Sequence, residues 1–191
     1  MLGMAKDNIV TAFQAVLERD PKRVGDAENT EEYIDFLNKE ISHYISKLIV
    51  NETNEQSSAA VSAYFKITGN IERIGDHAMN IAEYTKNMKK WDISFSDDAR
   101  TEIKKMKQVS MNILNVIDFT DATTPAAQLE TISKYEFLMD DMEKKYRKRQ
   151  IKRAKKGDCK AESGILFSEL LTDFERIGDY ALNIGELHAD M

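Results

Sequence analysis

The 191-residue sequence has few residues that bend or cross-link a chain: one cysteine, two prolines and eight glycines. The single cysteine, Cys159, excludes an intramolecular disulfide and a cysteine-based zinc finger, and it suits a reducing compartment. A β-sandwich or barrel would need many more turn residues, so the low proline and glycine counts favour long helices. We find no run of about 18 apolar residues, so we expect no membrane-spanning segment, and we expect no secretory leader.

The composition permits a sizeable core but favours no common catalytic class. Hydrophobic residues make up 42% of the chain and charged residues 31%, with a formal net charge of −6. A chain of this length buries enough apolar surface to fold without a metal or disulfide. Its acidity argues against a nucleic-acid partner. It contains no glycine-rich phosphate loop, nucleophile elbow or Cys/His pair.

Apolar residues recur at helical spacing throughout, which predicts an all-α protein. Six helices are expected, at residues 1–19, 21–51, 54–89, 97–119, 125–156 and 161–191. The residues expected to cap or end them are Asp20, Thr53 or Asn54, Ser94 or Ser96, Thr124 and Gly157.

The second half of the chain repeats the first. Residues 70–83, NIERIGDHAMNIAE, match residues 173–186, DFERIGDYALNIGE, at nine of fourteen positions with an offset of 103. Helix starts and core positions recur at offsets of 102 to 105. We therefore predict two pseudo-symmetric three-helix bundles, residues 1–92 and 93–191, rather than a longer repeat array.

The repeat also predicts that the first helix is about two turns short. The start of the fourth helix, moved back by 102 residues, falls before residue 1. Either the two copies differ in length, or the chain is cut from a longer protein or shortened at its start; we favour the second interpretation.

Four pairs of acidic residues lie four positions apart, at equivalent places in the two copies. Each pair shares one helix face, where like charges disfavour the helix by roughly 0.2–0.5 kcal/mol. The pairs are Glu31 and Asp35, Glu72 and Asp76, Glu136 and Asp140, and Glu175 and Asp179. A bound cation would offset the repulsion, and so would pairing with Arg73 and Arg176; the residues alone leave both alternatives open.

If a metal binds there, the donors are nearly all oxygen. Such a set favours iron, manganese, magnesium or calcium, with zinc as an alternative. Asn80, Glu83, Asn183 and Glu186 extend the same stripes as ligands or supports, and the glycines before Asp76 and Asp179 indicate close helix approach. A ferritin-like oxidase needs two Glu-x-x-His motifs, and only Glu40 to His43 fits.

One segment is strongly basic. Residues 144–156, KKYRKRQIKRAKK, contain nine Lys or Arg and no acid. The rest of the chain then has 18 basic and 33 acidic residues, a net charge of −15. This segment is either a solvated helix end whose cations favour the helix dipole or a docking surface for an anionic membrane leaflet, phosphate groups or an acidic protein.

The ERIGDHAMNIAE and ERIGDYALNIGE segments, with the acidic pairs Glu31–Asp35 and Glu136–Asp140, make the chain resemble the PhoU family. The resemblance covers nearly the whole chain. Residues 155–184 are especially similar to PhoU domains fused behind sodium–phosphate cotransporter membrane domains, which favours the interpretation that the chain is a fragment.

The resemblance implies a non-enzymatic regulator of phosphate uptake at the inner, cytoplasmic side of the membrane. Its implied partners are the membrane domain of a phosphate transporter, fused in cis or separate, and a sensor kinase. It also implies a multinuclear iron or zinc cluster held by the motif carboxylates. Carried over to this sequence, the metal ligands are Glu31, Asp35, Glu72, Asp76, Glu136, Asp140, Glu175 and Asp179.

Two rival functions stay open at this point. One is a metal-dependent hydrolase or oxidase that uses the acidic clusters, although the sequence places no nucleophile or histidine base beside them. The other is a purely structural helical oligomerisation module. A homodimer is an open assembly state for each of these functions.

Overall fold

The computed structural model describes residues 1–51, 54–120 and 123–191, and this part of the chain contains only helices and turns. The all-α prediction is therefore confirmed. The six helices are α1 (Leu2–Glu18), α2 (Pro21–Asn51), α3 (Glu55–Lys90), α4 (Asp97–Val116), α5 (Pro125–Lys156) and α6 (Ala161–Ala189).

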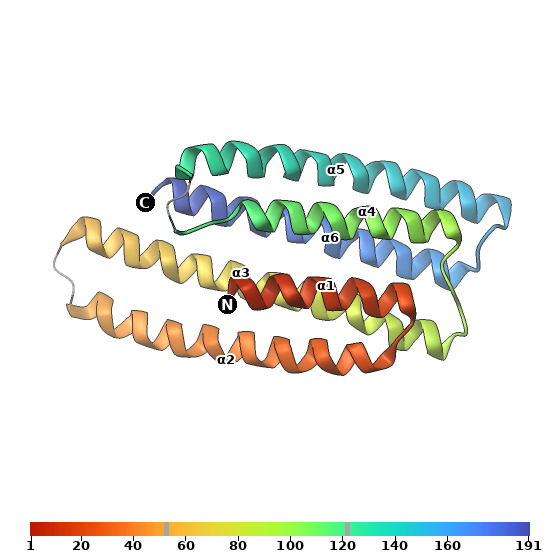
Figure 1. Cartoon of the computed structure of the whole chain (residues 1–191), viewed down its shortest axis with the longest axis horizontal. Coiled ribbons are helices and arrows are strands. Elements are labelled where there is room, and N and C mark those ends of the chain that lie inside the picture. The colour runs from red at the N-terminus through yellow and green to blue at the C-terminus, as the bar shows by residue number, and fades with distance from the viewer. Residues whose placement is uncertain (52–53, 121–122) are drawn as a thin grey trace.

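The helices form two layers (Figure 1). The four long helices lie side by side in the order α2, α3, α6, α5, and the short helices α1 and α4 cover one face of this layer. α1 packs on α2 and α3, and α4 packs on α5 and α6. The opposite face of the layer, the open face, has no covering helix among the described residues.

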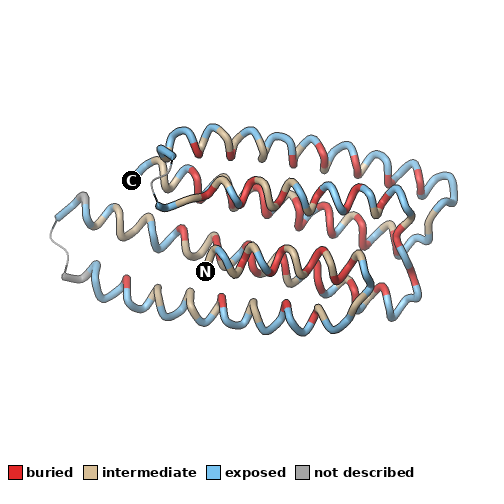
Figure 2. The backbone as a smooth tube through the Cα atoms, in the orientation of Figure 1, coloured by how far each residue is buried: buried red, intermediate tan, exposed pale blue. Residues whose placement is uncertain are grey.

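The two three-helix units share one core. The buried apolar side chains of all six helices belong to a single cluster, with Phe13 from α1, Ile74 from α3 and Phe174 from α6 among its fully buried members. Figure 2 shows these buried positions concentrated where α1 and α4 meet the long helices. α3 and α6 run antiparallel along the contact between the units. The turn between α3 and α4 contains the expected boundary at residues 92 and 93.

Most helix ends lie where the sequence predicts them. Ser96 and Thr124 accept hydrogen bonds from the backbone N–H groups of Ala99 and Ala127, as N-cap residues do. Asn54 caps α3 by accepting from the Ser57 N–H, and Thr53 lies outside the described residues. Gly157 ends α5 with a φ of 75°, a conformation that glycine adopts without steric cost.

The end of α4 is the clearest difference from expectation. The helix was expected to reach residue 119 but ends at Val116, because Ile117 turns to an extended conformation. The Gln128 side chain of α5 accepts a hydrogen bond from the Asp118 N–H and donates to the carbonyls of Asp118 and Thr123. A buried side chain from the next helix therefore provides the hydrogen-bond partners of this turn, which apolar periodicity does not reveal.

Candidate functional site

The first acidic cluster joins α2 to α3. Its members are Glu31 and Asp35 from α2 and Glu72 and Asp76 from α3; we call them the first carboxylate group. Partial burial and then the charges of Asp76, Asp35 and Glu72 raise the pKa of Glu31 above its ordinary value. Electrostatic coupling across the two helices means that the two predicted pairs form one group.

The pKa values of Glu72 and Asp76, in the same group, are also raised. Burial is the main cause of the raised pKa of Glu72, and the Asp76 charge adds to it while Arg73 opposes it. Burial also raises the pKa of Asp76, against the opposing charges of His77 and Arg73 and a hydrogen bond with Glu31. Desolvation and like charge both disfavour the ionised form, so the group is under electrostatic strain when fully ionised.

The second carboxylate group repeats this arrangement between α5 and α6. It consists of Glu136, Asp140, Glu175 and Asp179, each at the position equivalent to a member of the first group. Burial and then neighbouring carboxylates raise the pKa of Glu136. The pKa of Glu175 is raised by burial and by Asp179, with Arg176 opposing. The two groups thus have the same composition, and in each the pKa values of both glutamates are raised.

Internal cations neutralise only part of this charge. Lys39 pairs with Asp35 at 2.5 Å, and its counterpart Lys144 pairs with Asp140 at 3.0 Å. Arg176 pairs with Asp179 at 2.9 Å. Arg176 also lies 3.8 Å from Glu175. These pairs support the salt-bridge alternative in part, but four of the eight carboxylates, Glu31, Glu72, Asp76 and Glu136, have no ion pair within the part of the chain that the structure describes.

The two motif arginines behave differently. Arg73 is equivalent to Arg176, yet its guanidinium donates to the Tyr180 hydroxyl at 3.5 Å and lies 5.8 Å from the centre of the Tyr180 ring. Among residues 1–51, 54–120 and 123–191, no carboxylate lies within ion-pair distance of Arg73. The first group therefore has less internal neutralisation than the second.

The oxygen donors of each group are of the type that a hard cation binds, but their side chains do not point toward one common ion position. In the described residues no three acidic, histidine or cysteine side chains already have the spacing of a metal site. The glycines beside the motif aspartates let the helices approach closely, since a Cβ on Gly75 would lie 3.3 Å from Ile34 and one on Gly178 3.2 Å from Met139.

Asn80 and Asn183 have a different role from the one expected. Asn80 donates to Asp173 at 3.2 Å and Asn183 donates to Asn70 at 3.5 Å, both across the antiparallel contact of α3 with α6. Glu83 pairs with Lys86 on its own helix. Glu186 lines a groove at the same contact. Asn80 and Asn183 therefore join the two units, and Glu186 flanks their contact.

Sequence reasoning missed Asp173, the best-connected acid at the contact between the units. The residue is 5% exposed, and its side chain accepts from the Tyr84 hydroxyl at 2.5 Å, while His77 Nδ1 lies 2.7 Å away. Burial, and then the hydrogen bond to Asp173, raises the pKa of Tyr84 above its usual range. A signal was present, because Asp173 replaces Asn70 at the first position of the repeat, but only the packing shows its meaning.

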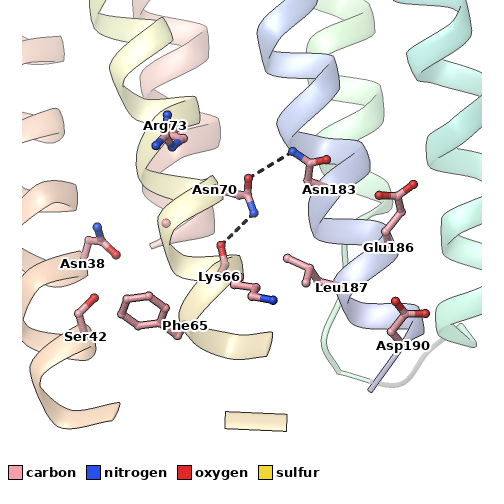
Figure 3. Close-up of a pocket in the computed structure, with 11 residues that line it drawn as sticks. Asn38, Ser42, Phe65, Lys66, Asn70, Arg73, Asn183, Glu186, Leu187 and Asp190 are labelled. Carbon is pink, nitrogen blue, oxygen red and sulfur yellow. Dashed lines mark hydrogen bonds between the residues drawn. The ribbon is translucent and has the colours of Figure 1, made fainter. Parts of the chain in front are cut away.

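A groove of about 470 Å³ lies at the other end of the α3–α6 contact. Figure 3 shows Asn70 and Arg73 of α3 at its centre, with Asn38 and Ser42 of α2 on one side and residues of α6 on the other. Asn183 bridges to Asn70 within it. Its lining includes Lys66 and Arg73 on α3 and Glu186 and Asp190 on α6, so opposite charges face each other across the groove.

The fold and the repeated carboxylate groups define an all-α protein built from two copies of a three-helix unit. A family model described as the PhoU domain matches residues 1–85 and again residues 103–187. The chain therefore belongs to the PhoU domain family. Both matched segments contain a complete carboxylate group, so the resemblance noted from the sequence is confirmed.

Relatives and solved structures agree with this assignment. The chain is 25% identical over 193 residues to the Thermotoga maritima phosphate-specific transport system accessory protein PhoU homolog 1, covering 97% of this chain and 80% of that protein. The phosphate-specific transport system accessory protein PhoU homolog of Xylella fastidiosa is 24% identical, and the match covers 96% of this chain and 75% of that protein.

Two crystal structures show the same fold. PhoU from Pseudomonas aeruginosa aligns with a TM-score of 0.88 at 18% identity, covering 98% of this chain and 89% of that one. The phosphate transport system regulatory protein PhoU from Streptococcus pneumoniae aligns with a TM-score of 0.83 at 19% identity, with 97% and 88% coverage.

The relatives are named as accessory and regulatory proteins, which agrees with the prediction of a non-enzymatic protein. Among the described helices, none combines the length and apolarity needed to cross a membrane. The likeness to cotransporter-fused domains stays a prediction.

Proposed function

We propose that this protein is a metal-binding regulator of phosphate transport that acts at the inner side of the membrane. Membership of the PhoU family supports the regulatory role, as do the names of the relatives, which place those proteins in phosphate-specific transport systems. The observation that carries the metal-binding part is the presence of two equivalent carboxylate groups, each with raised pKa values and incomplete internal neutralisation.

Each group supplies the ligands of a hard or borderline cation. Glu31, Asp35, Glu72 and Asp76 would hold one ion or cluster, and Glu136, Asp140, Glu175 and Asp179 the other. A cation would relieve the like-charge repulsion that raises the pKa values of these residues. Iron or zinc is the proposed metal, with manganese, magnesium and calcium as competitors for an oxygen-rich site.

Metal binding would couple the regulator's stability to metal supply. An ion that binds the folded chain but not the unfolded one stabilises it by about 2.7 kcal/mol at a hundredfold excess over its Kd. The carboxylates would also stay ionised when coordinated, so binding would weaken as the pH falls. The protein's role in this proposal is to hold two charged metal sites on one open face that a transport partner can contact.

The experiment is metal titration of chelator-treated protein, followed by metal content and melting temperature. Iron, zinc or manganese should raise the melting temperature of the wild type. The double variant Glu72→Gln/Asp76→Asn should lose the metal content and the rise in melting temperature that are due to the first group. Glu175→Gln/Asp179→Asn should lose those that are due to the second group. Glu40→Gln, an exposed acid of α2, is the matched control and should respond like the wild type. Equal metal content and an equal rise in melting temperature for the wild type and all variants would reject the proposed ligands.

The basic segment at residues 144–156 is proposed to contact the transporter's membrane domain or the anionic leaflet beside it. Fewer than nine of its cations are available for this. Lys144 pairs with Asp140, Arg147 pairs with Glu143, and Arg149 and Arg153 both pair with Glu102. Arg153 is itself buried, so the expectation that it belongs to the docking surface is corrected.

Lys145, Lys148 and Lys152 are exposed and line one shallow surface of α5. Near an anionic leaflet each lysine contributes about 1 kcal/mol, and salt weakens the effect. Changing all three to Gln should therefore lower sedimentation with anionic vesicles at low salt but not with neutral vesicles. Lys22, Lys89 and Lys90 changed to Gln provide a control with equal loss of charge. Equal sedimentation of the two triple variants would reject the leaflet as partner and leave the transporter itself to be tested by pull-down. A sensor kinase as second partner stays a prediction.

A further inference from the structure

The groove at the α3–α6 contact has side walls of opposite charge. The wall on α3 carries Lys66 and Arg73, and the wall on α6 carries Glu186 and Asp190. All four residues are exposed, and in Figure 3 the Lys66 side chain extends toward α6. Among residues 1–51, 54–120 and 123–191, none of the four side chains has an ion pair. The fold therefore holds these opposite charges apart, and they do not neutralise each other directly.

The equivalent place in the second copy is filled by a side chain of the protein itself. At an offset of 105, Ser42 in the groove corresponds to Arg147. At an offset of 103, Gly69 in the groove corresponds to Thr172. Arg147 crosses from α5 to α6, where its guanidinium donates to the Thr172 hydroxyl at 3.4 Å. In the first copy a Cβ added at Gly69 would meet no atom within 4 Å, so this part of the groove is open space.

A second difference in size opens the same groove further. In the other half of the α3–α6 contact, the Tyr84 hydroxyl donates to Asp173 at 2.5 Å. Their counterparts in the groove are Leu187 and Asn70, and leucine has no hydroxyl to donate. A guanidinium and a phenol of the chain thus fill one place, while smaller residues leave about 470 Å³ in the other. Clefts of this size bind small organic molecules.

One polar atom beside the groove lacks a hydrogen-bond partner. The amide oxygen of Asn38 is buried and accepts from no described residue, and Figure 3 shows it directed toward α3. Its counterpart in the second copy is Glu143, which accepts from the Arg147 guanidinium. A buried acceptor without a donor costs free energy. This place therefore requires a donor that the described residues do not supply.

The arrangement of charges determines which class of ligand fits. The two cations and two carboxylates of the walls cancel, so an anion without a positive group would be repelled by the α6 wall. Lysine and arginine bind phosphate and carboxylate oxygens, and an ammonium group donates to carboxylates and to an amide oxygen. Because packed helices lie about 8–10 Å apart, several bonds must separate the two charged ends. Phe65 and Leu187 provide apolar surface for the spacer.

We propose that the groove binds a small zwitterion, with its phosphate or carboxylate end at Lys66 and Arg73 and its ammonium end at Glu186 and Asp190. The ligand would contact α2, α3 and α6 together, so its binding would hold the two three-helix units in their present arrangement. The lining contains none of the eight proposed metal ligands, and the proposal does not depend on metal binding.

The test is isothermal titration calorimetry of the full chain with a chelator present. O-phosphoethanolamine and γ-aminobutyrate are the probes, and at least one of them should bind saturably. The tighter of the two identifies the oxyanion as phosphate or carboxylate. The half-ligands ethyl phosphate and ethanolamine, or butyrate and butylamine, carry one charged end each. They should bind about tenfold more weakly than the matching zwitterion, because one wall of the groove then has no partner.

Charge variants test the two walls separately. Lys66→Gln should weaken both the zwitterion and its anionic half-ligand by about two- to fivefold, the range for exposed charge pairs. Glu186→Gln should weaken the zwitterion similarly but strengthen the anionic half-ligand, because a repelling charge is removed. Lys90→Gln and Glu83→Gln are the matched controls. They remove the same charges from exposed positions of α3 outside the groove and should bind as the wild type does.

A further variant restores the side chains of the second copy. Gly69→Thr/Leu187→Tyr should fill the groove and abolish binding, and Gly69→Thr alone should weaken it. Helical content and melting temperature check that both proteins are folded. The proposal is overturned if neither zwitterion gives saturable heat up to about 10 mM, if a half-ligand binds as tightly as the zwitterion, or if all variants bind alike. Because chelator is present, each of these failures leaves the metal proposal standing.

Discussion

Neutralising Glu31 should stabilise the metal-free protein, although the change removes a charged surface residue. Burial and four neighbouring carboxylates raise the pKa of Glu31, and no neighbouring cation is among the causes of the shift. Each like-charge neighbour at helical spacing costs roughly 0.2–0.5 kcal/mol. Asp35 has that spacing, and Asp76 and Glu72 add repulsion from α3, so Glu31→Gln should raise the free energy of unfolding by up to about 1 kcal/mol.

The direction of the pKa shift determines how the stability gain from Glu31→Gln depends on pH. Because burial and neighbouring carboxylates raise the folded-state pKa of Glu31 above its ordinary value, protonation favours the folded state. This contribution is fully present below the ordinary pKa and is lost as the pH rises through the raised value. The gain from Glu31→Gln should therefore be largest near pH 7 and should vanish near pH 4, where the glutamate is protonated in both states.

Thermal unfolding of chelator-treated protein measures the effect. For a chain of this size, about 1 kcal/mol corresponds to a rise in Tm of roughly 2–4 °C, and added salt should reduce it. Glu40→Gln removes one acid from the same helix outside the group and should leave Tm nearly unchanged. A fall in Tm for Glu31→Gln at pH 7, or a gain that persists at pH 4, would refute the electrostatic reasoning. In the presence of the bound metal the sign should reverse, because a ligand is lost.

Four further changes probe the packing between and within the units. Asp173→Ala leaves the Tyr84 hydroxyl and the Asn80 amide without their partner, so the free energy of unfolding should fall by about 3 kcal/mol in urea denaturation. Arg153→Met leaves Glu102 buried with a single arginine partner, Arg149, and should cost up to about 3 kcal/mol, less than a buried charge left wholly unpaired; an unchanged urea midpoint would contradict the buried pair. Gly25→Ala meets no atom within 4 Å and should raise Tm through helix propensity, whereas an added Cβ at Gly185 would lie 2.9 Å from Ile132, so Gly185→Ala should lower it.

Much of the fold was predictable because its determinants are local. The N-caps at Ser96 and Thr124 and the stop at Gly157 are short-range signals that act within one turn of a helix. The carboxylate groups were predictable for a similar reason. A spacing of four residues fixes the face of each helix, and the internal repeat indicates which faces correspond.

The features that were missed depend on contacts between residues far apart in the chain. Arg153 belongs to a basic segment by sequence but is buried on Glu102, 51 residues away. Asp173 meets His77, Asn80 and Tyr84 only because α3 and α6 pack antiparallel. A count of charges along the sequence treats all of these residues as exposed, and only the packing separates structural charges from available ones.

The contact between the two units shows where the duplicated copies have diverged. His77 stacks on its own counterpart Tyr180, with 5.6 Å between ring centres, which places the pseudo-two-fold axis near this pair. On one side of the axis the Tyr84 hydroxyl reaches Asp173 and is partly buried there. On the other side the counterpart of Tyr84 is Leu187, which has no hydroxyl to reach Asn70, and the groove of about 470 Å³ lies there instead.

The carboxylate groups do not share this asymmetry. The eight acids and the paired lysines Lys39 and Lys144 occupy equivalent places in both copies. The residues at the contact between α3 and α6 differ between the copies. Loss of an acid that has no ion pair would relieve repulsion and stabilise the fold, as argued for Glu31. Stability of the metal-free chain therefore does not account for two complete groups, whereas a ligand that each group binds, or a partner that contacts both, would.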